Sequence, residues 1–162
     1  MHELKKTNAC RLLDKANVDY EIVAYQVHET DLSAPVVAAS LGEPVEQVFK
    51  TIVLTGDKMK YFVCVVPGNC EINLKKAARV SGNKRCDTLP LKALLPLTGY
   101  VRGGCSPVGM KKSFPTFIDV SAQVFPFIYV SAGQRGLQLK IAPEALAAQV
   151  KAQFADLTEK EP

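Results

Sequence analysis

Hydrophobic and polar positions alternate along the chain with two different periods. The first hydrophobic stripe has the i, i+3, i+4, i+7 spacing of an amphipathic helix and consists of Ala9, Leu12, Leu13 and Ala16. Residues 20–25 then read YEIVAY, which is typical of a β-strand. The run SAPVVAASL, residues 33–41, has a capping serine, an early proline and a glycine directly after it. The first three predicted elements are therefore a helix, a strand and a short helix.

The middle of the chain predicts a hairpin followed by two helices. Residues 49–55 and 60–66 are rich in β-branched and aromatic side chains, and the turn T-G-D-K between them is typical of an antiparallel pair. Asn73 is a favourable N-cap for the helix LKKAARVS, which Gly82 ends. The run LKALLPL then leads, as a second short helix, into Gly99.

The last third of the chain predicts four strands and a helix. Residues 100–105, 116–120 and 125–131 are β-like, and the strand LQLKI follows a glycine-rich turn. The predicted last helix starts at Pro143 and carries on one face Leu146, Val150, Phe154 and Leu157. Strands joined by short turns and interrupted by helices, with no internal repeat or linker, predict a single α+β domain over residues 1–162, curled around a central sheet.

Composition narrows the class of protein. The chain has 162 residues, 48% of them hydrophobic and 22% charged, which is typical of one packed domain. It has no apolar run of membrane-spanning length, and its first residues lack the zones of a signal peptide, so we expect a cytoplasmic protein without a membrane partner. The five cysteines are scattered, form no C-x-x-C pair and are accompanied by two histidines, which argues against a metal site or a disulfide framework.

The net charge of +4 permits a polyanionic partner but does not require one. The basic residues gather in one segment, at Lys75, Lys76, Arg79, Lys84 and Arg85. Others flank glycine-rich turns, at Lys111, Lys112 and Arg135. A nucleic-acid interface and a solvated helix face both have this pattern, so both interpretations stay open.

The sequence contains none of the common catalytic motifs: no G-x-S-x-G, H-E-x-x-H, P-loop or G-x-G-x-x-G. The remaining candidates are polar residues at strand ends. Lys50 begins an otherwise apolar strand, so its ammonium either extends into solvent or projects into a cleft. The glycines of residues 103–109 either expose backbone N–H groups to an anion or only form a turn. The serine, glycines and arginine of residues 129–136 suit a phosphate or ribose edge, or a plain hairpin turn.

Four segments taken together are more specific than any one alone. V-F-K-T, G-Y-V-R-G-G-C-S-P-V-G-M-K-K, P-T-F-I-D and I-Y-V-S-A-G-Q-R-G-L, in this order and spacing, resemble the YbaK/EbsC family of aminoacyl-tRNA deacylases. The resemblance extends from the helix at Ala9 to the last helix. It implies a curled, largely antiparallel sheet wrapped by helices, and an enzyme without metal or cofactor that clears misacylated tRNA. In the YbaK branch, cysteine is removed from the proline tRNA.

The resemblance also implies a role for each matching residue. Lys50 would be the catalytic residue, which holds the aminoacyl ester and stabilises negative charge in the transition state. The substrate-binding residues would be Tyr25, Gly103, Gly104, Ser131, Gly133 and Arg135. The amides of Gly103 and Gly104 would receive the carbonyl oxygen as it becomes an oxyanion, and Tyr25 and Ser131 would position the adenosine end and the ester. Relatives carry an acidic residue where this chain has Gln138, so a role for that carboxylate does not carry over.

The implied chemistry is substrate-assisted, because the thiol of the bound cysteine would attack its own ester and leave as a cyclic thiolactone. A deacylase that removes alanine, serine or proline by water attack is an alternative, as is a non-catalytic protein that binds tRNA or a synthetase. A domain without an RNA partner is the fourth interpretation. Prolyl-tRNA synthetase is the protein partner that the resemblance suggests.

Overall fold

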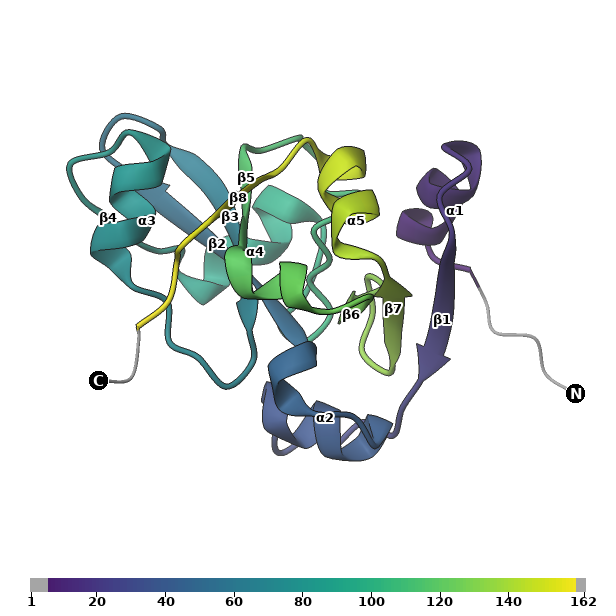
Figure 1. Ribbon diagram of the computed structural model, residues 1–162. Coiled ribbons are helices and arrows are strands. Elements are labelled where there is room, and N and C mark those ends of the chain that lie inside the picture. Colours follow the sequence, from purple (N-terminus) through teal and green to yellow (C-terminus); the bar gives the residue numbers. More distant parts are fainter. Residues whose placement is uncertain (1–5, 160–162) are drawn as a thin grey trace, which may run out of the picture.

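The computed structural model describes residues 6–159, and in that part of the chain helices and strands alternate in an α+β order (Figure 1). The α-helices are α1 (Asn8–Lys15), α2 (Ala34–Leu41), α3 (Leu74–Ser81), α4 (Leu91–Thr98) and α5 (Pro143–Val150). The strands are β1 (Tyr20–Ala24), β2 (Phe49–Gly56), β3 (Tyr61–Pro67), β4 (Cys86–Thr88), β5 (Thr116–Asp119), β6 (Ile128–Ser131), β7 (Leu137–Ile141) and β8 (Gln153–Ala155). Two short 3-10 helices are η1 (Val45–Gln47) and η2 (Val120–Val124).

The strands form two sheets. One has the order β1-β7-β6 and is antiparallel throughout. The other has the order β4-β2-β3-β5-β8, antiparallel from β4 to β3 and parallel from β3 to β8. A parallel bridge between Val48 and Tyr129 joins the sheets just before β2 begins. The predicted mixed, largely antiparallel α+β fold is therefore confirmed, with the curled sheet divided into two that meet at this bridge.

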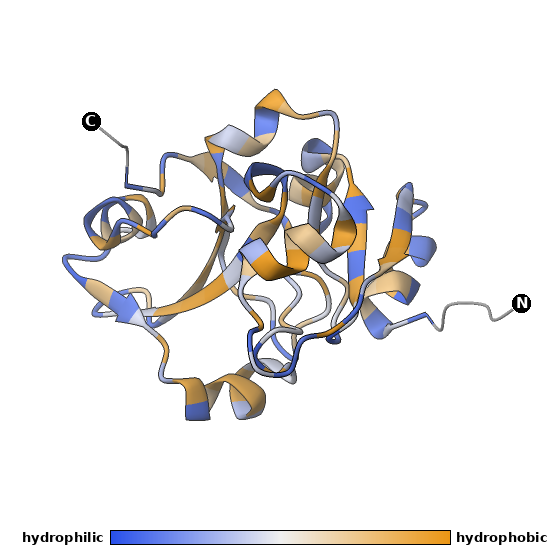
Figure 2. Cartoon of the chain, turned by 90° about the horizontal axis from the view of Figure 1, so that it is seen from below, coloured by the Kyte–Doolittle hydropathy of each residue, from blue (hydrophilic) through white to orange (hydrophobic). Residues whose placement is uncertain are grey.

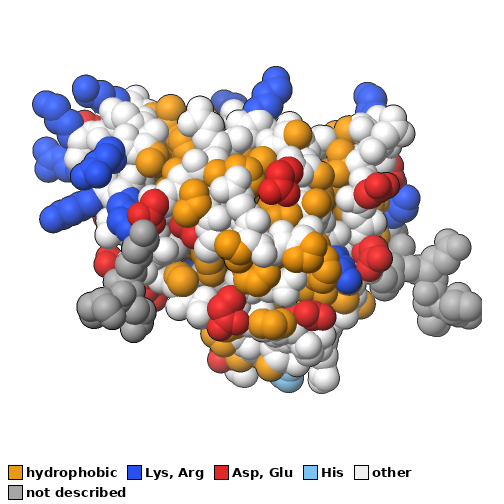
Figure 3. All heavy atoms as spheres, viewed as in Figure 1, with side chains coloured by type: hydrophobic (Ala, Val, Ile, Leu, Met, Phe, Trp, Pro, Cys, Tyr) orange, Lys and Arg blue, Asp and Glu red, His pale blue; other side chains and the backbone are white. Residues whose placement is uncertain are grey.

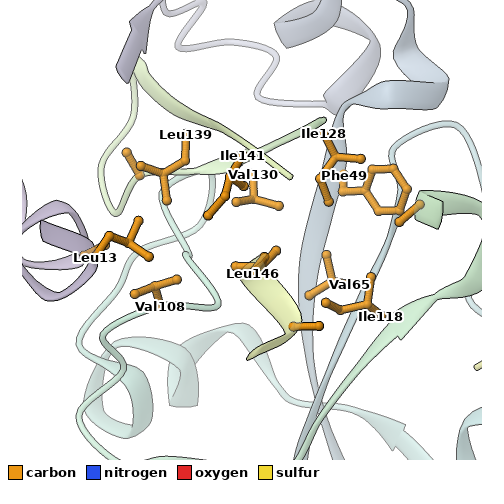
Figure 4. Packing of buried hydrophobic residues seen from close by; sticks show 14 of the residues in the cluster. Leu13, Phe49, Val65, Val108, Ile118, Ile128, Val130, Leu139, Ile141 and Leu146 are labelled. Carbon is orange, nitrogen blue, oxygen red and sulfur yellow. The ribbon is translucent and has the colours of Figure 1, made fainter. Parts of the chain in front are cut away.

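The main hydrophobic core lies where the two sheets and two helices meet (Figure 4). Leu13 of α1 and Leu146 of α5 are fully buried there beside Val130 of β6. A second cluster fills the space under α3, where Ala77 packs against Leu54 of β2. Figure 2 shows the long strands mostly in hydrophobic colours and the outer loops in hydrophilic ones. None of the helices in residues 6–159 has the length and hydropathy needed to cross a bilayer.

The predicted strand over residues 100–105 is wrong, because this segment is an irregular loop. The Gly104 amide donates to the carbonyl of Val101 at 3.0 Å and closes a turn, and Gly103 has φ +83°, a left-handed conformation that strands do not use. The predicted strand over residues 125–131 is confirmed only from Ile128 onward, because its first residues lead out of a 3-10 helix.

The predicted last helix is too long. It ends at Val150, because Lys151 turns into the left-handed region (φ 56°) and Ala152 donates back to the carbonyl of Ala147 at 2.8 Å. Phe154 therefore belongs to β8, which adds a parallel edge strand to β5. Leu157 is fully buried, but in the cluster under α3 and not on the face of α5. Pairing with a distant strand outweighs the helical spacing of these residues.

Candidate functional site

A cavity of about 300 Å³ opens between the two sheets at the start of β2. Its walls are residues 48–52, the N-terminus of α2, the loop at Arg102–Cys105, Ser131 at the end of β6, and Gln138 of β7. A larger hollow, of about 450 Å³, lies between α1, α5 and residues 107–116, and contains none of the predicted site residues. The smaller cavity is the candidate site, since it brings together polar groups from both sheets.

Lys50 enters the cavity because the sheets separate there. The Val48–Tyr129 bridge holds β2 and β6 together, and two residues later Lys50 pairs only with Val66 of β3. The side chain is half-buried. No ion pair or hydrogen bond links its ammonium to any other residue within 6–159. Lys50 therefore presents an unpaired positive charge to the cavity.

Three other polar side chains reach the cavity from neighbouring strands. Ser131 and Gln138 are a directly opposed pair between β6 and β7, with only 8% and 5% of their surface exposed. The Ser131 hydroxyl accepts a hydrogen bond from the amide of Gly133 at 3.1 Å. By contrast, Gln138 Oε1 and Thr51 Oγ1 are buried and have no hydrogen-bond partner in the described structure. Buried polar atoms are normally paired, so these two stand out as groups that lack a partner within the described residues.

The glycine loop is held against the turn that follows β6. A Cβ on Gly104 would lie 3.0 Å from the Cα of Gln134, so the close approach of the two backbones favours glycine there. Arg135 Nε donates to the carbonyl of Arg102 at 2.8 Å, and its Nη1 contacts Glu29 Oε2 at 3.3 Å. These contacts fix the cavity wall that contains Gly103.

The structure thus divides the predicted site residues into two groups. Lys50, Gly103 and Ser131 line the cavity together. The other four lie behind its wall: Tyr25, Gly104, Gly133 and Arg135. The amide of Tyr25 donates to the carbonyl of Gly136 at 2.9 Å, which extends the pairing of β1 with β7 by one residue. None of these four is among the lining residues: Gly104 and Arg135 hold the loop and the turn of the wall together, and the amide of Gly133 donates to Ser131.

The charge in the cavity is positive. Its lining contains Lys50 and Arg102 and, among the described residues, no aspartate, glutamate or histidine. The nearby Asp31 accepts a hydrogen bond from the Ser33 amide at 3.0 Å, and hydrogen bonds from Ser33 lower its pKa, which makes it a poor base. Burial raises the pKa of the Cys105 thiol in the lining to about 12, so this thiol stays neutral at physiological pH.

Sequence reasoning did not identify Cys105 or Thr51 as cavity residues. The available signal for Thr51 is a polar residue next to Lys50 in an apolar run. It lines the cavity because the sheets separate at this point. Groups of three or more histidine, cysteine or acidic side chains that could hold a metal ion are not found in the described residues.

Comparison with known proteins agrees with this arrangement. A profile of the family described as "Aminoacyl-tRNA editing domain" matches residues 28–148, which include every cavity-lining segment. The chain belongs to the aminoacyl-tRNA editing domain family. It is 48% identical over 157 residues to an Enterococcus faecalis (strain ATCC 700802 / V583) protein named "Putative Cys-tRNA(Pro)/Cys-tRNA(Cys) deacylase EbsC", covering 97% of this chain and 96% of that one.

Two solved structures share the fold of this editing domain. A protein described as a "putative trans-editing enzyme for prolyl tRNA synthetase" superposes with a TM-score of 0.81 at 24% identity, over 96% of this chain and all of the other. Hypothetical protein APE2540 superposes with a TM-score of 0.84 at 20% identity, over 92% and 97% of the two chains. The family resemblance seen in the sequence, the fold and the assignment to aminoacyl-tRNA deacylases are thus confirmed.

Proposed function

We propose that this editing domain removes cysteine from Cys-tRNA(Pro) and Cys-tRNA(Cys), and that the substrate supplies the nucleophile. The similarity to the Enterococcus protein supports the choice of substrate. The observation that carries the mechanism is the chemistry of the cavity lining: an unpaired lysine ammonium, a neutral thiol, and no carboxylate or imidazole among the described lining residues. The lining hydroxyls of Ser33, Thr51 and Ser131 have no lining carboxylate or imidazole to activate them as nucleophiles, whereas a cysteinyl ester carries a thiol of its own.

In the proposed reaction, the sulfur of the bound cysteine attacks its own ester carbonyl carbon. The carbonyl oxygen becomes an oxyanion, which the Lys50 ammonium stabilises by charge and hydrogen bonding. The bond between the carbonyl carbon and the ribose oxygen then breaks, and that oxygen takes up the proton lost by the thiol. The products are a cyclic thiolactone and uncharged tRNA, and water later opens the thiolactone to free cysteine.

The two unpaired polar atoms suit an aminoacyl ester. Thr51 Oγ1 can donate to the ester carbonyl, and Gln138 Oε1 can accept from the α-amino group. A cavity of about 300 Å³ is at the small end of ligand sites, which fits an aminoacyl ribose better than a whole aminoacyl-adenosine. We assign Gly103 and Ser131 to substrate binding, and Tyr25, Gly104, Gly133 and Arg135 to positioning of the wall around it.

The test is release of labelled cysteine from Cys-tRNA(Pro), with Ala-tRNA(Pro) and Ser-tRNA(Pro) alongside. We expect Lys50→Ala to lower kcat/KM by about 100-fold or more, as loss of an oxyanion donor does. Lys92→Ala, an exposed lysine on α4, is the matched control and should match the wild type, as should Cys105→Ser. The thiolactone should be detectable by mass spectrometry. Equal rates on the alanyl and cysteinyl substrates would overturn the thiol mechanism.

We further propose that residues 1–162 act as one cytoplasmic editing unit that works beside prolyl-tRNA synthetase. The support is the described role of the structural neighbour, together with a cavity that is sized for the aminoacyl end alone and so selects no tRNA body. Co-elution of the two proteins with tRNA(Pro) on a sizing column would test the partnership. A synthetase that elutes at the same volume with and without this protein would contradict it.

A further inference from the structure

We infer that the end of the molecule farthest from Lys50 along β2 is an RNA-backbone contact that holds the tRNA body while its aminoacyl end occupies the cavity. Six cations form this end, which we call the basic end: Lys58, Lys60, Lys75, Arg79, Lys84 and Arg85. All six side chains are exposed, and none has an ion-pair partner among residues 6–159. Figure 3 shows this gathering of Lys and Arg side chains at the upper left, over the region of α3 and β4 in Figure 1. The inference rests on the proposed function.

The basic end is assembled from two stretches of the chain, residues 58–60 and 75–85, and Asn83 joins them. Its Oδ1 accepts from the amides of Lys58 and Met59 at 2.8 and 2.7 Å, and its Nδ2 donates to the Ser81 hydroxyl at 2.8 Å. Asp57, in the turn after β2, makes a second link between the two stretches, since its carboxylate accepts a hydrogen bond from the amide of Lys84 at 2.9 Å. The turn after β2, the end of α3 and the approach to β4 are thus locked together, and the cations project from a rigid base.

Lys76 is set apart from the exposed cations of the basic end by its ion pair with Asp156. Lys76 lies beside Lys75, but its ammonium donates to Asp156 and to the carbonyl of Thr158, both at 2.9 Å, so it fastens α3 to the last segment. The six cations of the basic end make no such ion pair within residues 6–159. The segments that carry the six exposed cations, residues 57–60 and 75–87, contain two carboxylates, Asp57 and Asp87. The surplus of positive charge matches a repeating array of phosphates.

The geometry relates the basic end to the cavity. Every second residue of β2 points to the same face of the five-stranded sheet, so Lys50, Ile52 and Leu54 share one face. Ile52 and Leu54 pack in the cluster under α3, so Lys50 and α3 lie on the same side of that sheet. Gly56 lies six positions after Lys50 in β2, which at about 3.3 Å per position is roughly 20 Å. At about 3.4 Å per stacked nucleotide, this equals roughly six nucleotides of one strand. RNA whose 3′ end lies in the cavity can therefore reach the basic end.

The experiment compares two variants that each lose four positive charges. The test variant carries Lys75→Ala, Arg79→Ala, Lys84→Ala and Arg85→Ala, and the control carries Arg11→Ala, Lys15→Ala, Lys92→Ala and Lys112→Ala at exposed positions elsewhere. Each is measured for binding of uncharged tRNA(Pro) at several salt concentrations, and for cleavage of Cys-tRNA(Pro) and of a C-C-A trinucleotide bearing a 3′ cysteinyl ester.

We expect the test variant to bind tRNA at least about tenfold more weakly at 0.1 M salt, with a slope of log K against log salt reduced by about 3, close to 0.7 per lost contact. Its KM should rise for the full tRNA and stay unchanged for the trinucleotide, and the control should follow the wild type. Equal effects of the two variants on tRNA would overturn the inference, because only net charge would then matter.

The failure of the inference can be distinguished from failure of the proposed function. If the trinucleotide is cleaved and the test variant binds tRNA like the control, the function stands and the RNA contact is refuted. If neither ester is cleaved but the salt slope for uncharged tRNA still depends on the basic end, the contact stands and the proposed reaction is refuted. If the fourfold variant does not fold, two double variants, Lys75/Arg79→Ala and Lys84/Arg85→Ala, should each lower the slope by about 1.4.

Discussion

Thr51→Val should make the protein more stable and less active at the same time. The Thr51 hydroxyl is buried at the cavity wall without a hydrogen-bond partner among the described residues. Leaving such a group unpaired costs about 1–3 kcal/mol, and valine keeps the shape while removing the polar atom. We expect the free energy of unfolding to rise by about 1 kcal/mol, a gain of roughly 2–4 °C in Tm for a chain of this size.

The same change should lower the rate of ester cleavage. If the hydroxyl donates to the ester carbonyl in the transition state, its loss removes roughly 0.5–1.5 kcal/mol, and kcat/KM falls by up to about tenfold. Thermal unfolding and release of labelled cysteine measure the two effects. Thr55→Val is the matched control, because Thr55 is on the same strand and is not among the buried unpaired atoms, so neither quantity should change much. A destabilised Thr51→Val, or one with wild-type kcat/KM, would refute the reasoning.

Substitutions at three other residues should change stability or kinetics in defined ways. Gln138→Leu should leave the free energy of unfolding unchanged or higher and raise KM for the cysteinyl ester, which steady-state kinetics would test, whereas a wild-type KM would contradict the assigned contact. Asn83→Ala should lower the free energy of unfolding by about 3 kcal/mol in a urea titration, because two backbone amides lose their acceptor; a loss below about 0.5 kcal/mol would contradict this. The folded protein favours the neutral thiol of Cys105, because burial raises its pKa from 9.0 to about 12. The contribution of this thiol to the free energy of unfolding is complete below pH 9 and is lost as the pH rises to 12. Between these values, the wild type should lose about 1.4 kcal/mol more stability per pH unit than Cys105→Ala. Parallel curves of stability against pH for the two proteins would refute this.

Hydrophobic spacing, helix caps and turn residues predicted most of the fold, because most helices and strands contain these signals within their own segment. The side-chain oxygen of the Asn73 cap accepts a hydrogen bond from the amide of Lys76 at 3.0 Å as expected, and Gly82 ends the same helix in the left-handed region. The failures lie where distant pairing decides. Residues 153–155 continue a helical spacing, yet they complete the parallel edge of β5, a partner more than thirty residues away. No local propensity contains that information.

The site was predictable only in part for the same reason. The family resemblance identified Lys50, and the structure places it in the cavity with Gly103 and Ser131. It could not separate residues that line the cavity from those that support it, because Arg135 reaches the carbonyl of Arg102 across 33 positions of sequence. Nor could it identify Thr51, whose access to the cavity depends on the separation of the two sheets after the Val48–Tyr129 bridge.

The unpaired groups of the cavity bear on how a small site selects one amino acid. Lys50 and Thr51 offer donors, and Gln138 Oε1 offers an acceptor, which together complement the carbonyl and the amino group of any aminoacyl ester. If the three residues bind the ester as proposed, they would recognise what all aminoacyl-tRNAs share and would give binding without discrimination. In the proposed reaction, an ester is cleaved only when the bound side chain can attack it. Selectivity for cysteine would then come from the reactivity of its thiol in the chemical step, and a shape-selective pocket that rejects alanine or serine would not be needed.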